Sequence, residues 1–181
     1  MRINVIAVSL STSEVFLTPK KAYDMIFQHK DGHFSHISIK EEIMKTRVEE
    51  TITKHDKGYN CAQAVACTYC DLVGIDEKIM FQLTEGLGLG MGGMTGTCGA
   101  VSGACVLAGM KQSNGNLEHP DSKADTYKLS KEIVKRFEEQ NKSVVCKTLK
   151  GVETGTVLRS CGDCIKDAAR IAEQVLFENE V

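Results

Sequence analysis

Apolar residues recur at helical spacing through most of the chain. A capping box at Ser38 opens the first clear run, which continues through Val48 and Ile52 and stops at Gly58. Cap residues and glycine stops predict further helices over 61–72, 76–82, 98–110 and 143–151, and two more that open at residues 120 and 160. No strand pattern of similar strength follows. We therefore expect an all-α fold, a compact bundle of five to seven helices, with the glycine-rich stretch 86–93 as a connecting segment.

The first 37 residues differ from the rest. They contain three of the five histidines and no cysteine, and we interpret them as an N-terminal appendage with a short strand and a short helix. Residues 38–181 form the predicted helical, cysteine-rich redox domain. The first ten residues have one basic side chain and no small-x-small cleavage site, so we expect no export signal and a cytoplasmic location.

Charge and hydropathy exclude several classes of protein. Lys and Arg total 22 and Asp and Glu total 24, which leaves a net charge of −2. A nearly neutral chain is not expected to bind nucleic acid or an acidic membrane by bulk electrostatics. No apolar run reaches the roughly 18 residues that a membrane-spanning helix needs. The predicted partners are therefore proteins, not nucleic acid or membrane.

Cysteine is the unusual component, with eight residues in the chain. Four of them lie in the first turn of a predicted helix: Cys61, Cys98, Cys146 and Cys161. Backbone N–H groups are free at a helix start and the dipole is positive there, so we expect the thiol pKa to be lowered. In a reducing cytosol, metal binding or redox chemistry is then more plausible than structural disulfides.

Several kinds of chemistry fit these thiols. Four thiolates with spare amide donors suit an iron–sulfur cluster, and four thiolates also suit tetrahedral zinc. Cys161 and Cys164 form a CxxC pair at a helix start, which is typical of thiol–disulfide oxidoreductases. Cys67, Cys70 and Cys105 are interpreted as small core residues. Cys164, Cys105 and Tyr59 are kept as second-rank site residues, and His55 as a lone histidine that could serve as a ligand or proton relay.

The order of motifs resembles a known family. The segments are Asn60-Cys61-Ala62-Gln63, Thr97-Cys98-Gly99-Ala100-Val101-Ser102-Gly103, Val145-Cys146-Lys147-Thr148-Leu149-Lys150-Gly151, and Cys161 leading into Ile165-Lys166-Asp167. In this order they resemble the C-GCAxxG-C-C family of redox-active proteins. A related domain occurs in split-Soret cytochrome c, which carries an iron–sulfur centre and works as a dimer. The likeness covers about residues 40–178 and implies redox activity and a homodimer.

We therefore expect electron transfer or redox sensing through an iron–sulfur cluster held by Cys61, Cys98, Cys146 and Cys161, with a redox partner protein. The alternatives are a thiol–disulfide oxidoreductase that uses Cys161 and Cys164, and a zinc-stapled structural or interaction module. No catalytic residue is assigned under the first hypothesis. The segment 88–93 fits GxGxxG but lacks a preceding strand, so nucleotide binding is not expected.

Overall fold

A computed structural model describes residues 46–178. The chain divides into Met1–Met44 and Lys45–Val181, and all described residues belong to the second unit. The expected appendage at 1–37, with its strand and helix, and the capping box at Ser38 lie outside the described residues. Within residues 46–178 the regular elements are helices, joined by one isolated β-bridge between Thr97 and Val145. The all-α prediction is confirmed.

The first described helix is shorter than its apolar pattern predicted. It is α3, Val48–Asp56, and the two residues before it are not helical. The carboxylate of Glu173 accepts hydrogen bonds from the Arg47 backbone N–H at 2.7 Å and from the Thr46 hydroxyl at 2.8 Å. A carboxylate from another helix therefore satisfies the start of α3, which the local sequence could not indicate.

Helix α4, Cys61–Thr68, begins where its cap predicted. The Asn60 side chain accepts from the N–H groups of Ala62 and Gln63, and the Gln63 side chain accepts in return from the Asn60 N–H at 2.9 Å. This capping box orients the first turn of α4 and hence Cys61. The predicted continuation to residue 72 is instead a separate 3-10 turn, η1 (Cys70–Val73).

Short elements follow up to the central helix. They are α5 (Glu77–Thr84), η2 (Glu85–Leu87) and α6 (Gly88–Met91). Three of the four residues of α6, Leu89, Gly90 and Met91, have positive φ, so this segment is an irregular turn. It occupies the glycine-rich stretch that was expected to connect helices.

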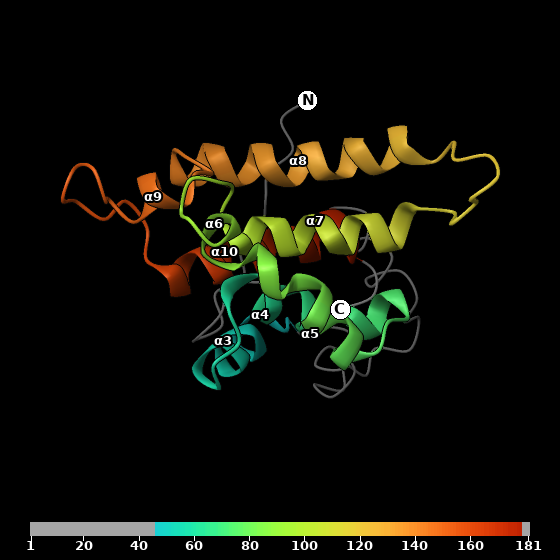
Figure 1. The fold of residues 1–181 in the computed structure, drawn as a ribbon, viewed down its shortest axis with the longest axis horizontal. Coiled ribbons are helices and arrows are strands. Elements are labelled where there is room, and N and C mark those ends of the chain that lie inside the picture. The colour runs from blue at the N-terminus through green and yellow to red at the C-terminus, as the bar shows by residue number, and fades with distance from the viewer. Residues whose placement is uncertain (1–45, 179–181) are drawn as a thin grey trace, which may run out of the picture. The chain divides into compact units, whose positions relative to one another are not determined.

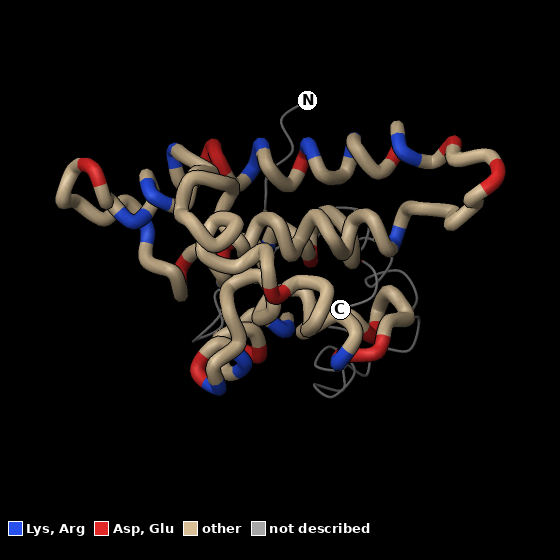
Figure 2. Tube along the Cα trace, viewed as in Figure 1, with Lys and Arg blue, Asp and Glu red and all other residues tan. Residues whose placement is uncertain are grey.

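Helix α7, Gly99–Gln112, lies at the centre of the described unit, between α8 (Lys123–Asn141) and α4 in the view of Figure 1. Figure 2 shows why: charged residues recur along α8, whereas α7 is uncharged until Lys111 near its end. Small residues let α7 approach its neighbour closely, because a β-carbon on Gly103 would lie 2.5 Å from the Ala62 carbonyl oxygen of α4. The last two helices are α9 (Cys146–Leu149) and α10 (Cys161–Leu176).

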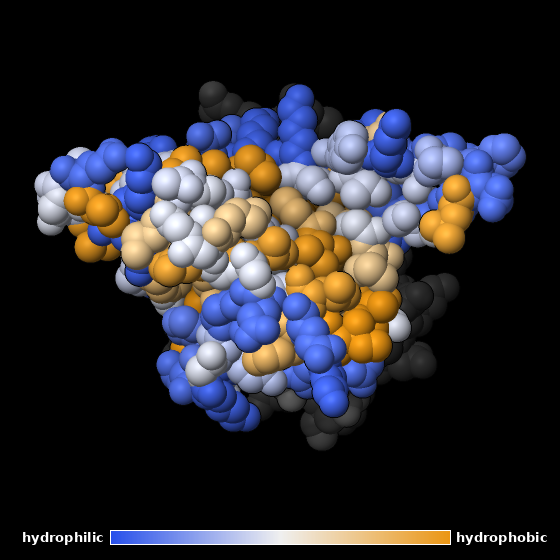
Figure 3. Space-filling view, viewed as in Figure 1, coloured by the Kyte–Doolittle hydropathy of each residue, from blue (hydrophilic) through white to orange (hydrophobic). Residues whose placement is uncertain are grey.

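The core runs through all the long helices and contains Tyr69, Phe137, Phe177 and Ile165, all fully buried. The apolar pattern of α8 predicts that Ala124 and Tyr127 face the core together with Ile133 and Phe137, but both are exposed, Tyr127 at 65%. Tyr127 lies a full turn before the buried stretch around Ile133. Figure 3 shows that apolar surface also gathers between α7 and α5, where Ile79 and Leu83 are exposed. Among the described residues, no helix combines the length and apolarity required to cross a membrane.

Candidate thiol site

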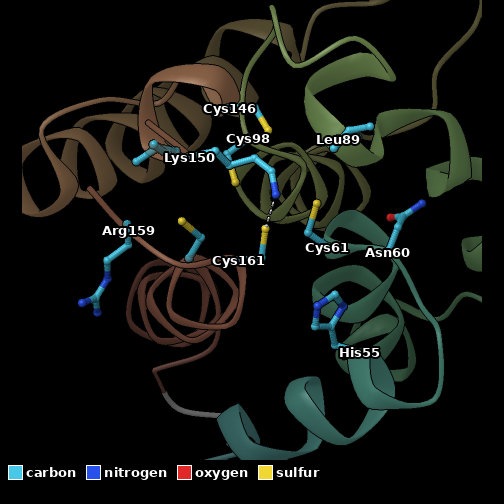
Figure 4. Close-up of a pocket in the computed structure, with 11 residues that line it drawn as sticks. His55, Asn60, Cys61, Leu89, Cys98, Cys146, Lys150, Arg159 and Cys161 are labelled. Atoms are coloured by element: carbon cyan, nitrogen blue, oxygen red, sulfur yellow. Dashed lines mark hydrogen bonds between the residues drawn. The ribbon is translucent and has the colours of Figure 1, made fainter. Parts of the chain in front are cut away.

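Five cysteines line one cavity of about 160 Å³. Figure 4 shows the labelled thiols of this site coming from several elements and gathering around the same space. The five are Cys61 of α4, Cys98 at the start of α7, Cys146 of α9, and Cys161 and Cys164 of α10. The structure thus brings together the four cysteines singled out in the sequence, with Cys164 beside them.

Four of these thiols lie at helix starts. Cys61, Cys146 and Cys161 are the first residues of their helices, and Cys98 is the residue before α7. The local details differ in two cases. Cys98, predicted as the first residue of its helix, is the N-cap of α7. Ser143 does not cap α9; its hydroxyl accepts from the Val145 N–H at 3.1 Å, and the N-cap of α9 is Val145, two residues later than expected.

The thiol of Cys98 occupies the middle of the group. It forms hydrogen bonds with the thiol of Cys61 and with that of Cys164. The backbone N–H of Ala100, in the first turn of α7, also donates to the Cys98 sulfur. Thiols from α4, from the residue before α7 and from α10 therefore interact within one group.

The glycine-rich turn supplies a further amide donor. The backbone N–H of Leu89 donates to the sulfur of Cys61. Leu89, Gly90, Met91 and Gly92 all have positive φ, between 52° and 77°. Such a left-handed conformation costs a non-glycine residue about 1–2 kcal/mol. Successive N–H groups in turns of this kind form concavities that bind anions, including the sulfurs of iron–sulfur sites.

The residues just after this turn, Met94 and Gly96, hold the start of α9 through backbone hydrogen bonds. The Cys146 N–H donates to the Gly96 carbonyl at 3.1 Å, and the Lys147 N–H donates to the Met94 carbonyl at 2.8 Å. A β-carbon on Gly90 would lie 2.6 Å from the Cys146 β-carbon. Glycine at position 90 is therefore needed both for its conformation and for the close approach to Cys146.

The pKa values of three helix-start thiols are opposite to the sequence prediction. The pKa of Cys61 is raised well above its ordinary value by its hydrogen bond to Cys98 and by burial. The hydrogen bond with Cys164, together with burial, raises the pKa of Cys98 to about 12. Burial, and then the nearby Cys61, raise the pKa of Cys146. Desolvation and crowding of like groups outweigh the helix N-terminus here, so these thiols ionise readily only next to a cation.

One ammonium group faces the thiols. Lys150 Nζ donates to the Cys161 sulfur at 3.2 Å, the contact drawn as a dashed line in Figure 4. This hydrogen bond, and then the charge of Cys161, raise the pKa of Lys150. Cys161, like Cys61, is half-buried, so a cation and a helix start meet at an accessible edge of the thiol group.

The family comparison agrees with this arrangement. A family model described as "Putative redox-active protein (C_GCAxxG_C_C)" matches residues 59–175. The chain belongs to the C-GCAxxG-C-C family. The matched segment includes every cysteine of the cavity. No curated protein and no solved structure has significant similarity to this chain. Membership confirms the resemblance and the coarse assignment to redox-active proteins.

Two other residues that line the cavity, Arg159 and His55, form hydrogen bonds with groups outside it. The carboxylate of Asp167, which is fully buried, accepts two hydrogen bonds from Arg159 at 2.8 and 3.1 Å. This pair fixes the segment just before Cys161 against α10. His55 contacts the Tyr59 carbonyl through Nδ1 at 2.8 Å. Because a carbonyl can only accept, Nδ1 carries the proton and Nε2 is free in the neutral ring.

Several second-rank residues lie elsewhere. Tyr59 does not line the cavity; its ring packs edge-on against Phe81 with centroids 4.8 Å apart. Cys105 is half-buried on α7 and hydrogen-bonded to Ser130. Cys67 and Cys70 belong to the hydrophobic core, as their interpretation as small core residues predicted. The sequence did not single out Lys150 or Leu89, although Lys150 lies in the third family segment and Leu89 in the glycine-rich stretch 86–93.

The donors of the cavity are thiols and backbone N–H groups. Within residues 46–178, no three or more His, Cys, Asp or Glu side chains are arranged to hold one metal ion. Tetrahedral zinc would need four sulfurs about 3.8 Å apart, given Zn–S bonds of about 2.3 Å. In an iron–sulfur cluster the four cysteines bind different irons, one on each iron of a [4Fe–4S] cluster and two on each iron of a [2Fe–2S] cluster, so the four sulfurs do not all surround one ion. Thiols around a common cavity, with amide donors, match the second requirement.

Proposed function

We propose that this chain is an electron-transfer or redox-sensing protein in which Cys61, Cys98, Cys146 and Cys161 hold an iron–sulfur cluster. The observation that carries the proposal is the convergence of these four helix-start thiols on one cavity. An iron–sulfur cluster, when bound, accepts and releases single electrons. The cytoplasmic location, the redox partner protein and the homodimer remain predictions.

The chain's own residues would do three things at this site. The four cysteines supply thiolates once a cationic group compensates the raised pKa values of Cys61, Cys98 and Cys146. The N–H groups of Leu89 and Ala100 donate to sulfur and stabilise negative charge there. Burial of Cys98 and Cys146 limits the access of water and oxygen to the sulfurs.

Anaerobic reconstitution tests the proposal. The reduced protein is incubated with iron and sulfide, and bound iron, bound sulfide and visible absorption are measured. Serine variants of Cys61, Cys98, Cys146 and Cys161 should each lose most of the bound iron. Cys105→Ser is the matched control, because Cys105 is a half-buried cysteine of α7 outside the cavity, and it should bind iron normally. A colourless protein without iron, or one with stoichiometric zinc only, would reject the cluster.

A thiol–disulfide oxidoreductase is the second candidate, favoured by the ammonium of Lys150 beside Cys161. The Cys161 thiolate would attack a substrate disulfide, forming a mixed disulfide and releasing one substrate thiol. Cys164 would then displace the second substrate thiol and leave a Cys161–Cys164 disulfide, two electrons having passed to the substrate. Reduction of insulin disulfides measures this activity. It should vanish in Cys161→Ser and persist in Cys105→Ser.

A further inference from the structure

The ammonium of Lys150 has an unusual environment for a lysine. Its hydrogen bond is to the Cys161 sulfur, and among residues 46–178 it forms no ion pair with a carboxylate. The other cationic side chain of the cavity, Arg159, is neutralised by Asp167 and points away from the sulfurs in Figure 4. Lys150 is therefore the cation whose charge acts directly on the thiols.

The backbone holds Lys150 in a defined place relative to the thiols. It follows directly after α9, and its N–H donates to the Cys146 carbonyl at 3.0 Å. Leu149, just before it, is 1% exposed and anchors this turn in the core. Cys146 is therefore the first residue of α9 and Lys150 the residue directly after it, and the Lys150 ammonium extends to Cys161 on α10.

We propose that Lys150 is a positioning residue that holds the Cys161 sulfur and offsets the negative charge that the thiol site gains on reduction. The role in electron transfer rests on the proposed function. A hydrogen bond between two groups of opposite charge is among the stronger ones in proteins. Because the ammonium stabilises the more negative state, it should make the site easier to reduce.

The potential measurement compares the parent protein with two variants at position 150 and one at position 147. Lys150→Met keeps the length of the side chain and removes the charge, and Lys150→Arg keeps the charge. Lys147→Met is the matched control: this lysine is on α9 but pairs with Glu153 at 2.6 Å. In reconstituted protein, Lys150→Met should disfavour the reduced state about tenfold, the lower end for a hydrogen bond to a charged group, or about 59 mV for one electron. Lys150→Arg should restore most of the change, and Lys147→Met should show none.

A second measurement needs no cluster. Metal-free, reduced protein is pulsed with iodoacetamide at one pH, and alkylation of each cysteine is followed by mass spectrometry. Lys150→Met should slow alkylation of Cys161 about tenfold, because the sulfur loses the hydrogen bond from the Lys150 ammonium that holds it. Alkylation of Cys105 should not change. Circular dichroism and urea unfolding verify that each variant is folded, with Lys150→Gln in place of Lys150→Met if that variant is not.

The outcomes separate the two proposals. If no variant or parent protein binds iron but Lys150→Met slows Cys161 alkylation, the cluster proposal fails and the action of Lys150 on Cys161 stands. If a cluster assembles and its potential is the same in Lys150→Met and the parent, the inference is overturned. An unchanged alkylation rate at Cys161 overturns it as well.

Discussion

A β-carbon on Gly99 would lie 2.5 Å from the sulfur of Cys61. The first residue of α7 is thus packed directly against the first thiol of α4. The same β-carbon would meet the Leu87 carbonyl oxygen at 2.9 Å, so backbone as well as side chain closes this space. The absence of a side chain at position 99 is a condition for the thiol group, and it can be tested.

Gly99→Ala should destabilise the reduced protein by roughly 1–3 kcal/mol, the usual effect of overpacking, and displace Cys61. Urea unfolding under anaerobic, reducing conditions measures the change. Gly109→Ala is the control on the same helix, since nothing lies within 4 Å of its β-carbon. It should stabilise α7 by about 0.5–1 kcal/mol. Equal effects of the two substitutions would show that position 99 is not crowded.

Gly90 and Gly92 allow crowding and backbone strain to be separated. Both have positive φ, but only the β-carbon of Gly90 would meet a neighbour, the Cys146 β-carbon at 2.6 Å. Gly92→Ala should cost about 1 kcal/mol of folding free energy for conformation alone. Gly90→Ala should cost more by a further 1–3 kcal/mol from overpacking. It should also reduce iron binding after reconstitution, whereas Gly92→Ala should not; similar losses in both would argue against contact with Cys146.

Asp167 should be important for stability because its carboxylate is fully buried against Arg159. Asp167→Asn leaves Arg159 with only the more distant, exposed carboxylate of Asp163 at 3.9 Å. Breaking a buried pair costs roughly 3–5 kcal/mol, and less here because Arg159 is 35% exposed. Thermal or urea unfolding measures the loss. Asp125→Asn removes an exposed partner of Lys128 and should change stability by less than about 1 kcal/mol. A small effect at both positions would contradict the structural role of Asp167.

The raised thiol pKa values make the metal-free protein sensitive to alkali. The pKa of Cys98 is about 12 in the folded protein because of its hydrogen bond with Cys164 and its burial. An unfolded cysteine titrates near about 8.5. The unfolded state therefore loses this proton first, and the stability that Cys98 contributes below about pH 8.5 falls by roughly 1.4 kcal/mol per pH unit as the pH rises toward 12.

Urea unfolding between pH 8 and 10 in a reducing buffer measures this slope. Cys98→Ala should make the decline with pH shallower by at least the contribution of one thiol. The removal of Cys98 also takes away the hydrogen bond that raises the pKa of Cys61, which acts in the same direction. Parallel curves for Cys98→Ala and the parent protein would contradict the assignment.

The sequence was sufficient for the features that depend on neighbours along the chain. Asn60 caps α4, Ser160 caps α10 and Gly74 ends η1 with a left-handed residue, as their residue types predicted. These signals succeed because a cap hydrogen bond spans only two or three residues. The family resemblance was likewise readable from motifs, and the family match confirms it.

The local sequence could not predict features that depend on contacts between helices. The start of α3 depends on Glu173 of α10, and the pKa of Cys98 depends on sulfurs from two other helices. Lys150 meets Cys161 only because the fold brings the end of α9 to the start of α10. A helix start favours an ionised thiol by itself, but burial among other thiols reverses that preference for Cys61, Cys98 and Cys146. Desolvation and contact between groups distant in sequence are properties of the packed structure, so the fold decides the chemistry that each cysteine can perform.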